Sequence, residues 1–237
     1  GVRLVGSEMC IRDRRCAAGA GSAHGENGGA QVVYLILICF AVPLLLLMTL
    51  LDRRSRLLVG FMLLGMLVAV SSYEINSTAQ FLLGMSGREI SVKVAPVVEE
   101  LLKALPVLFY AALVCDDRRQ LLPLGMSVGI GFALLENAYL LITYAEQVTL
   151  GWAVIRGIST SLSHGLCTLA VGYGMQFLRR QKKLFYTGIF GLLSLAMTYH
   201  ATFNLLIQSD LDWLGMLLPI TTYAVFRLLT RKKARKA

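Results

Sequence analysis

Residues 31–51, QVVYLILICFAVPLLLLMTLL, form a stretch without a charged side chain. A helix of roughly 20 apolar residues crosses the ~30 Å hydrocarbon core of a bilayer, so this stretch predicts a membrane span. Further apolar stretches of comparable length follow at 57–76, 94–115, 122–145, 149–178, 184–207 and 212–229. With 56% hydrophobic and 16% charged residues among 237, and a mean hydropathy of +0.66, the chain is more apolar than one soluble core requires. We therefore predict an all-α, polytopic transmembrane helical bundle of about seven spans.

Basic residues mark one side of the predicted bundle. The connections after the first, third, fifth and seventh spans read DRRSR, DDRRQ, RRQKK and RKKARK, and with Arg227 they hold 15 of the 23 Lys and Arg residues. Because basic connections tend to stay in the cytoplasm, the pattern predicts an N-terminus outside and a cytoplasmic C-terminus. The net charge of +9 thus concerns membrane orientation and the lipid bilayer, and we expect no nucleic-acid partner.

The segments outside the spans carry less structural signal. Residues 1–30 are Gly-rich and aperiodic, so we predict a disordered tail, and the string SEMCIRDR at 7–14 resembles a sequence-assembly artefact rather than native coding. We expect the bundle over 31–230 and a basic cytoplasmic tail at 231–237. The connection at 77–93 is interpreted as a plain loop in preference to a lid or a lateral gate.

Ionisable and strongly polar side chains lie inside several predicted spans. An ionisable group in hydrocarbon costs roughly 2.5–3.5 kcal/mol on insertion scales, so such groups usually face the bundle interior and mark function. Because each helical residue rises ~1.5 Å, the alternating directions of four spans bring these groups to one level in the outer half of the membrane. The third to sixth spans contribute, in turn, Glu99, Glu100 and Lys103; Glu136 and Asn137; His164; and His200 and Asn204. We predict that Glu99 or Glu100, Glu136, His164, His200 and Asn204 converge on one cavity open toward the outer side.

Two basic residues lie within these spans. Lys103 follows Glu99 by four residues and Glu100 by three, so it can neutralise a carboxylate on its own helix. Adjacent helical side chains point about 100° apart, so one of the two glutamates must find another partner or take up a proton. That carboxylate is a candidate base, and a purely structural ion pair is the alternative. Arg156, near the outer end of the fifth span, is interpreted as an interfacial anchor.

The other polar residues each have a structural alternative. Glu136 and Asn137 also suit an inter-helix hydrogen-bonding pair. His164, and His200 with Asn204 four residues later, also suit side chains that hold helices together. Their common depth favours a functional site over three separate structural contacts.

Two hydrolytic routes suit this set of residues. In the first, Glu136, His164 and His200 hold a metal ion, with Zn²⁺ as the candidate, and leave a position open for water. In the second, no metal is needed, and Glu99 takes a proton from a water molecule that His164 orients. His200 and Asn204 then donate hydrogen bonds to the developing oxyanion. Both routes hydrolyse an amide.

Four motifs follow one another on successive spans. They are Glu99-Glu100-x-x-Lys103, then GFALLEN at 131–137, then His164, then His200-x-x-x-Asn204. In this order they resemble the PrsW family of intramembrane proteases, which is related to the CAAX-processing and bacteriocin-processing proteases. The resemblance covers a motif core at 94–207, and its specificity lies in the order of the four motifs.

The resemblance implies roles for these residues. It makes Glu99 and Glu100 an essential acidic pair, with Glu99 as the water-activating base. It implies two essential histidines and an oxyanion partner, which are His164, His200 and Asn204. It implies site support from Lys103, Glu136 and Asn137.

The resemblance also implies a substrate and a location. PrsW-type proteins are associated with the first cut in an anti-sigma factor, so the implied substrate is a single-span membrane protein of that kind. The implied location is a bacterial inner membrane. Metal dependence stays open at this point, because family members are labelled metalloproteases whereas the related CAAX enzymes are argued to be glutamate-dependent.

Two other functions suit the same residues. Carboxylates, a lysine and histidines inside a bundle also form proton or cation relays, so a coupled transporter is the first alternative. Pro96 and Pro106 are placed to break the third span as in transporters, but no matching interrupted segment occurs in a second half of the sequence. A catalytically inactive membrane scaffold is the second alternative, and it ranks last because every motif residue is present.

Overall fold

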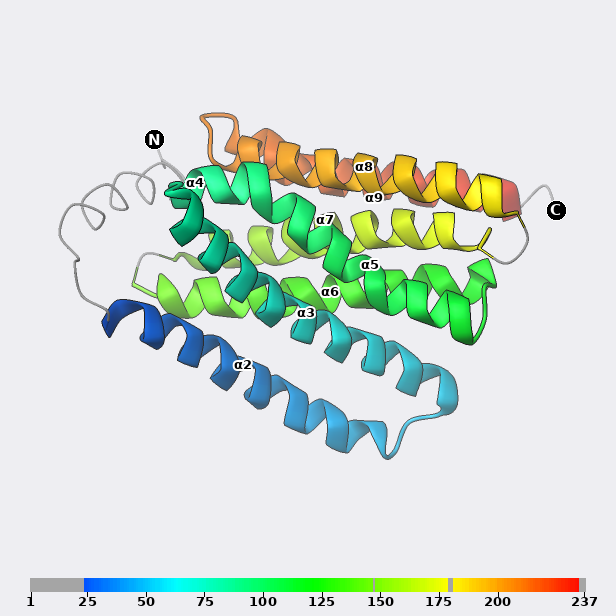
Figure 1. Cartoon of the computed structure of the whole chain (residues 1–237), viewed down its shortest axis with the longest axis horizontal. Helices are drawn as coiled ribbons and strands as arrows, with labels where there is room; N and C mark the ends of the chain where they lie inside the picture. The colour runs from blue at the N-terminus through cyan, green and yellow to red at the C-terminus, as the bar shows by residue number, and fades with distance from the viewer. Residues whose placement is uncertain (1–23, 147, 179–180, 235–237) are drawn as a thin grey trace.

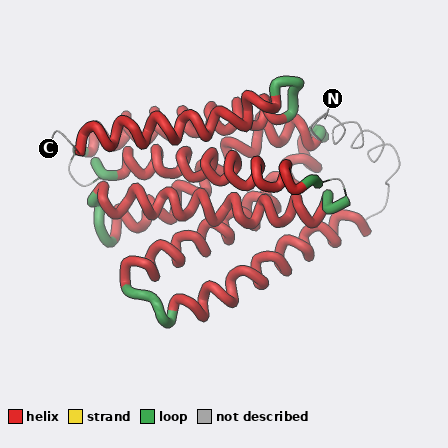
Figure 2. Tube along the Cα trace, turned by 180° about the vertical axis from the view of Figure 1, so that it is seen from behind, coloured by secondary structure: helices red, strands yellow, loops and turns green. Residues whose placement is uncertain are grey.

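The computed structural model describes residues 24–146, 148–178 and 181–234, and every regular element in this part of the chain is helical. The long helices run along the long axis of the molecule in alternating directions (Figure 1, Figure 2). The elements are α2 (His24–Met48), α3 (Arg53–Leu83), α4 (Gly87–Glu89), the π-helical turn η1 (Ile90–Val94), α5 (Ala95–Leu113), α6 (Arg118–Thr143), α7 (Leu150–Met175), α8 (Lys182–Ile207) and α9 (Asp212–Ala234). The predicted all-α class is confirmed for these residues.

Five of the described helices are long and apolar enough to cross a membrane. The qualifying segments are Gln31–Met48, Arg53–Leu83, Arg118–Thr143, Lys183–Ile207 and Asp212–Thr230. Large apolar side chains on them face outward, such as Leu46 and Phe190, each 66% exposed, and a surface of this kind suits lipid. The other two long helices are α5 and α7, which carry the charged and histidine side chains of the third and fifth predicted spans.

Glycines on α6 let the centre of the bundle pack closely. A Cβ atom on Gly129 would overlap the backbone carbonyl of His164 on α7, and one on Gly131 would overlap that of Met62 on α3. Because glycine has no Cβ atom, the backbones of α3 and α7 both approach α6. This approach brings His164 of α7 within hydrogen-bonding distance of Glu136 on α6.

The segment that joins α3 to α5 is mostly helical. α3 continues past the predicted end of its span to Leu83, and Gly84, with a φ of 59°, ends it in the left-handed conformation. Ser86 and Glu89 then form a capping box, in which each side chain accepts a hydrogen bond from the other residue's backbone N–H. The prediction of a plain loop over 77–93 is therefore wrong, because these local signals order the chain as helix.

A π-helical turn leads from α4 into α5. The backbone N–H of Ala95 donates to the carbonyl of Ile90, five residues earlier. Pro96 has no N–H, and its ring would clash with a carbonyl four residues earlier in a regular α-helix, so the wider turn accommodates it. Pro106 lies inside α5 without ending it, and the helix continues to Leu113.

The first and last described helices, α2 and α9, differ from the predicted limits of the bundle. α2 begins at His24, so residues 24–30 of the predicted tail are helical, while residues 1–23 lie outside the described part of the chain. The start of α2 packs closely on α3, because a Cβ atom on Gly29 would lie 2.6 Å from the Tyr73 hydroxyl oxygen. This packing overrides the low helix propensity of a Gly-rich stretch. α9 likewise continues to Ala234, and residues 235–237 of the basic tail lie outside the described residues.

Candidate active site

A buried ion pair on α5 forms the base of the site. Lys103 and Glu100 lie one turn apart with 2.6 Å between Nζ and Oε1, and both side chains are fully buried. The same Oε1 atom lies 2.9 Å from Nδ1 of His200 on α8. Glu100 therefore joins its own lysine to the histidine of a second helix.

His164 of α7 lies between two charged partners. Its Nδ1 atom is 2.8 Å from the Lys103 ammonium nitrogen, and its Nε2 atom is 2.8 Å from Oε2 of Glu136. An ammonium group has only donors, so Nδ1 accepts and Nε2 carries the proton that is donated to Glu136. The ring also packs against Phe132 and edge-on against His200, with centroid distances of 4.8 and 4.7 Å. These contacts fix both the tautomer and the orientation of the imidazole.

Arg156 neutralises Glu136 inside the bundle. Its Nη2 atom lies 3.0 Å from Oε1 of Glu136, and its side chain is 16% exposed. The guanidinium group also lies over the ring of Trp152, 5.4 Å from its centre. The interpretation of Arg156 as an interfacial anchor is therefore wrong, because α7 turns this side chain inward to the carboxylate on α6.

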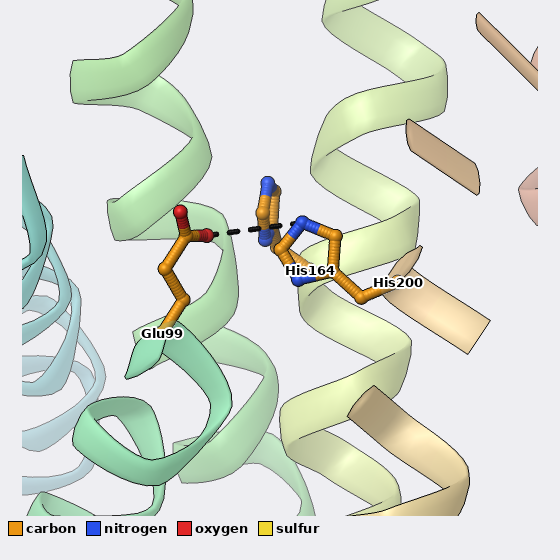
Figure 3. Close-up of side chains that lie close together, drawn as sticks. All are labelled: Glu99, His164 and His200. Carbon is orange, nitrogen blue, oxygen red and sulfur yellow. Dashed lines mark ion pairs between the residues drawn. The ribbon is translucent and has the colours of Figure 1, made fainter. Parts of the chain in front are cut away.

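Glu99 differs from Glu100 and Glu136, which each pair with a basic side chain. Among the described residues no Lys or Arg nitrogen lies within ion-pair distance of it. Its Oε1 atom accepts a hydrogen bond of 3.3 Å from Asn76 on α3, and its Oε2 atom lies 3.8 Å from Nε2 of His200. Figure 3 shows the Glu99 carboxylate facing the His200 ring, with His164 beside it. On this side of the site, the Glu99 carboxylate lies opposite a ring nitrogen of His200 and makes no ion pair with a described Lys or Arg.

One cavity of about 460 Å³ contains this side of the site. Its lining includes Glu99, Glu136 and Asn204, so three of the predicted residues share it. His164 and His200 are buried beside it, each only 2% exposed. The two histidine rings are in contact with each other and do not point to opposite faces of the bundle. The structure thus brings together the polar residues of four helices.

The cavity reaches one end of the bundle. Gln80 near the end of α3, Tyr144 at the end of α6 and Gln208 at the end of α8 all line it. Arg88 of α4 lines the same region and donates a hydrogen bond of 3.1 Å to the carbonyl of Gln208. A route from Glu99 to the end of the bundle therefore passes among these helix termini.

Two predicted residues make no hydrogen bond to Glu99 or His200 in the described part of the chain. Asn204 donates its amide N–H to the carbonyl of Ser91 in η1, at 2.8 Å, although it follows His200 by one turn. The buried Oδ1 atom of Asn137 has no hydrogen-bond partner among the described residues, and this residue does not line the cavity. The structure thus joins Asn204 to the π-helical turn and leaves Asn137 outside the polar contacts of the site.

A metal ion has a suitable donor set at this site. One ligand atom from each of Glu99, His164 and His200 lies within 4.8 Å of the others. Two imidazoles and a carboxylate are a set that zinc accepts in catalytic sites. The set has Glu99 in place of the predicted Glu136, whose carboxylate oxygens lie 3.0 Å from Nη2 of Arg156 and 2.8 Å from Nε2 of His164.

The match to a known family agrees with this geometry. The family model described as PrsW family intramembrane metalloprotease matches residues 53–230. The chain belongs to the PrsW family. The predicted resemblance is confirmed, and the match extends beyond the motif core on both sides, from α3 to the last turns of α9. No curated protein and no solved structure matches the chain.

Family membership and the fold together give the general class of enzyme and its association with the membrane. A PrsW protein is a hydrolase, an intramembrane peptidase, and the five apolar helices make this chain an integral membrane protein. The matched region contains every helix that contributes to the polar site, whereas α2 precedes it. α2 nevertheless contributes Val33 to the wall of the cavity.

Sequence reasoning missed two residues of the site. Asn76 belongs to no motif, and the only signal for it is a strongly polar side chain at the end of an apolar stretch. Arg156 was visible in the sequence, but its direction depends on the rotation of α7. For both residues, the signal in the sequence is a strongly polar side chain within or at the end of an apolar stretch, where an anchor at the membrane surface is not required.

Proposed function

We propose that this PrsW protein hydrolyses a peptide bond of a single-span membrane protein, with Glu99 as the base that activates water. One observation carries the proposal: Glu99 lines the cavity, has no cationic partner among the described residues, and lies 3.8 Å from Nε2 of His200, which is buried beside the cavity. That distance is too long for a direct hydrogen bond, and a bridging water molecule suits it. A carboxylate that is not held by a cation is free to take a proton.

The two ring nitrogens of His200 indicate how the water molecule is held. Nδ1 donates to Glu100, so Nε2 presents a lone pair toward Glu99. A water molecule on the cavity side of these two atoms donates one hydrogen bond to each acceptor and keeps its own lone pairs for the substrate. Glu99 takes one proton as the oxygen attacks the carbonyl carbon, and the same proton then passes to the leaving amide nitrogen. The peptide bond breaks, and one water molecule is consumed.

The developing oxyanion needs a donor in the same cavity. Asn204 lines the cavity, and its amide now donates to the Ser91 carbonyl. We propose that, when substrate binds, the Asn204 amide releases the Ser91 carbonyl and donates its hydrogen bond to the oxyanion of the substrate. Removing one such donor typically costs about 10²–10³ in kcat.

A metal ion would change the demands on His164. The donor set Glu99, His164 and His200 fits zinc, and a bound zinc would supply Lewis-acid polarisation of the substrate carbonyl and an activated water. His164 now uses one ring nitrogen for Lys103 and the other for Glu136, so it must give up one partner to act as a ligand. Glu99 would then be a metal ligand and not the free base of the metal-free route. Activity that disappears with a strong chelator and returns with Zn²⁺ supports the metal route, and activity that persists through rigorous metal removal contradicts it.

The proposal includes a topology and a location. We infer that α5 and α7 cross the membrane together with the five apolar helices, which gives seven spans, an N-terminus outside and the C-terminus in the cytoplasm. α5 has 19 residues, roughly 28 Å at ~1.5 Å each, and α7 has 26. The cavity then opens to the outer side of a bacterial inner membrane. A cut near the outer surface of a substrate such as an anti-sigma factor suits this position.

A proton or cation transporter is the second candidate function. A continuous series of hydrogen bonds and ion pairs joins Arg156, Glu136, His164, Lys103, Glu100 and His200. Series of this kind also conduct protons in transport proteins. Flux measured in liposomes distinguishes this function from proteolysis.

The test of the proposal is cleavage of a panel of single-span membrane proteins by the purified chain, read by mass spectrometry. We expect the wild type to cut at one position and Glu99→Gln and His200→Ala to leave the panel intact. Cleavage by Glu99→Gln at the wild-type rate contradicts the proposal. Proton flux that depends on these residues, with the whole panel uncut, supports the transporter.

A further inference from the structure

A second cavity lies at the opposite end of α6 from the Glu99 cavity. It has a volume of about 320 Å³, near the lower end of the size range of ligand pockets. α6 and α9 form its sides with Leu122 and Phe226, and α7 contributes Leu169 and Ala170 between them. It shares no lining residue with the Glu99 cavity, which reaches the end of α6 at Tyr144. The surface of this groove is mostly hydrocarbon.

One exposed arginine, Arg118, lines this apolar groove. Arg118 is the first residue of α6, and its guanidinium carbon lies 4.9 Å from the ring centre of Tyr173 on α7. Among the described residues no carboxylate lies within ion-pair distance of Arg118. The guanidinium group therefore packs against an aromatic ring and makes no ion pair within the described part of the chain.

The position of Arg118 along α6 indicates the chemistry of a ligand. α6 is one of the five helices long and apolar enough to cross a membrane, so its first residue lies at the level where lipid headgroups meet the acyl chains. Arg53 at the start of α3 and Lys183 at the start of α8 lie at the same end of the bundle (Figure 1). An arginine presents paired donors to phosphate oxygens, and tyrosine favours the same interfacial level.

We propose that this groove binds one anionic phospholipid, with its phosphate on Arg118 and an acyl chain between α6 and α9. The unpaired charge selects a headgroup with net negative charge, because a zwitterionic headgroup brings its own cation to the site. The apolar walls select a ligand with a hydrocarbon chain, which inorganic phosphate lacks. Basic pockets between membrane helices bind anionic headgroups in this way.

The site is tested by native mass spectrometry of the full chain in detergent, titrated with phosphatidylglycerol and, separately, with phosphatidylcholine. We expect one phosphatidylglycerol to be retained, with phosphatidylcholine bound more weakly. Arg118→Gln should weaken phosphatidylglycerol binding by about fivefold, the contribution expected of one basic residue near the surface. Ala170→Phe, which fills the groove while keeping the charge, should also weaken it.

Arg119→Gln is the matched control, because it removes the same charge one residue away and Arg119 does not line the groove. We expect this variant to bind phosphatidylglycerol as the wild type does, and all three variants to keep the wild-type unfolding midpoint. Equal losses in Arg118→Gln and Arg119→Gln would overturn the proposal in favour of general charge attraction. Equal binding of the two lipids, or release of bound lipid by millimolar inorganic phosphate, would also overturn it. None of these outcomes depends on proteolytic activity.

Discussion

Glu99 and Glu100 are adjacent on α5, yet they lie in different surroundings. Glu100 is 1% exposed and is held by Lys103 and His200 at 2.6 and 2.9 Å. Glu99 lines the cavity, and its polar contacts with other described residues are a hydrogen bond from the Asn76 amide and the His200 imidazole nitrogen 3.8 Å away. Adjacent side chains on a helix point about 100° apart, which is enough to turn one into the bundle and the other to the cavity. The comparison separates a carboxylate that joins helices from one that is available for chemistry.

The largest effect on stability is expected where the buried pair is broken. Lys103→Met leaves Glu100 buried without its cation and removes a donor to His164, so the free energy of unfolding should fall by about 3–5 kcal/mol. Unfolding in mixed detergent measures it. The control is Lys93→Met, which breaks the exposed, solvent-screened pair with Glu89 and should cost much less. Equal losses in the two variants would contradict the assignment of the Lys103 pair as structural.

A smaller loss of stability is expected when Arg156 is replaced. This partly buried residue is at one end of the series of hydrogen bonds and ion pairs that leads to His200. Arg156→Gln leaves Glu136 with His164 alone, and a loss of about 1–3 kcal/mol is typical of a buried polar group that loses a partner. Thermal unfolding of the purified chain measures it. Arg88→Gln is the matched control, because that exposed arginine bonds only a backbone carbonyl in the described part of the chain. Similar midpoints for the two variants would indicate that Arg156 does not stabilise the bundle.

On the cavity side, the expected effect is on rate rather than on stability. Asn76→Ala removes the hydrogen bond to Glu99, so kcat should fall by about tenfold, since a hydrogen bond to a charged group contributes roughly 1.5 kcal/mol or more. KM and the unfolding midpoint should change little, and Asn76→Gln should restore part of the rate. Ser77→Ala alters a neighbouring residue that also lines the cavity, and it should keep the wild-type kcat. A fall in kcat in both variants would make the cavity wall in general, rather than this amide, responsible.

The smallest effect is expected at the capping box outside the spans. The Lys93 ammonium, 2.9 Å away, and the Ser86 donors hold the pKa of Glu89 at about 2, below its ordinary 4.5. Because the folded pKa is lowered, the stabilisation is present above pH 4.5 and is lost as the pH falls toward 2. Hydrogen exchange of the amides at 87–94, corrected for intrinsic rates, should therefore show lower protection at pH 3 than at pH 5. Glu89→Gln should remove this difference, and a difference that persists would exclude Glu89 as its source.

Much of the fold follows from apolar length alone. In the described part of the chain, a long helix lies at each of the predicted apolar stretches, and five of these helices are long and apolar enough to cross a membrane, where a backbone has few alternatives to helix. The helical structure of the chain between Leu83 and Ala95 does not follow from hydropathy. Its order comes from a glycine C-cap, a capping box and a π-helical turn that suits Pro96.

Spacing along the chain predicted that several of the polar residues meet, but not which partner each side chain takes. Glu99, Glu136 and Asn204 share a cavity because residues at one level on neighbouring helices meet inside a bundle. Which partner each side chain takes depends on the rotation of its helix, which spacing along the chain does not give. Arg156 thus pairs with Glu136 rather than acting as an anchor at the membrane surface, and the Asn204 amide donates to the Ser91 carbonyl of η1.

The most direct test of the account compares Glu99→Gln with Glu100→Gln in two measurements on the same preparations, cleavage rate and unfolding free energy. We predict that Glu99→Gln abolishes cleavage and keeps the wild-type stability, because only the cavity-facing base is lost. Glu100→Gln should be strongly destabilised, because it leaves the Lys103 ammonium buried without a counter-ion. Cleavage retained in Glu99→Gln, or wild-type stability in Glu100→Gln, would contradict the division of roles between the two glutamates.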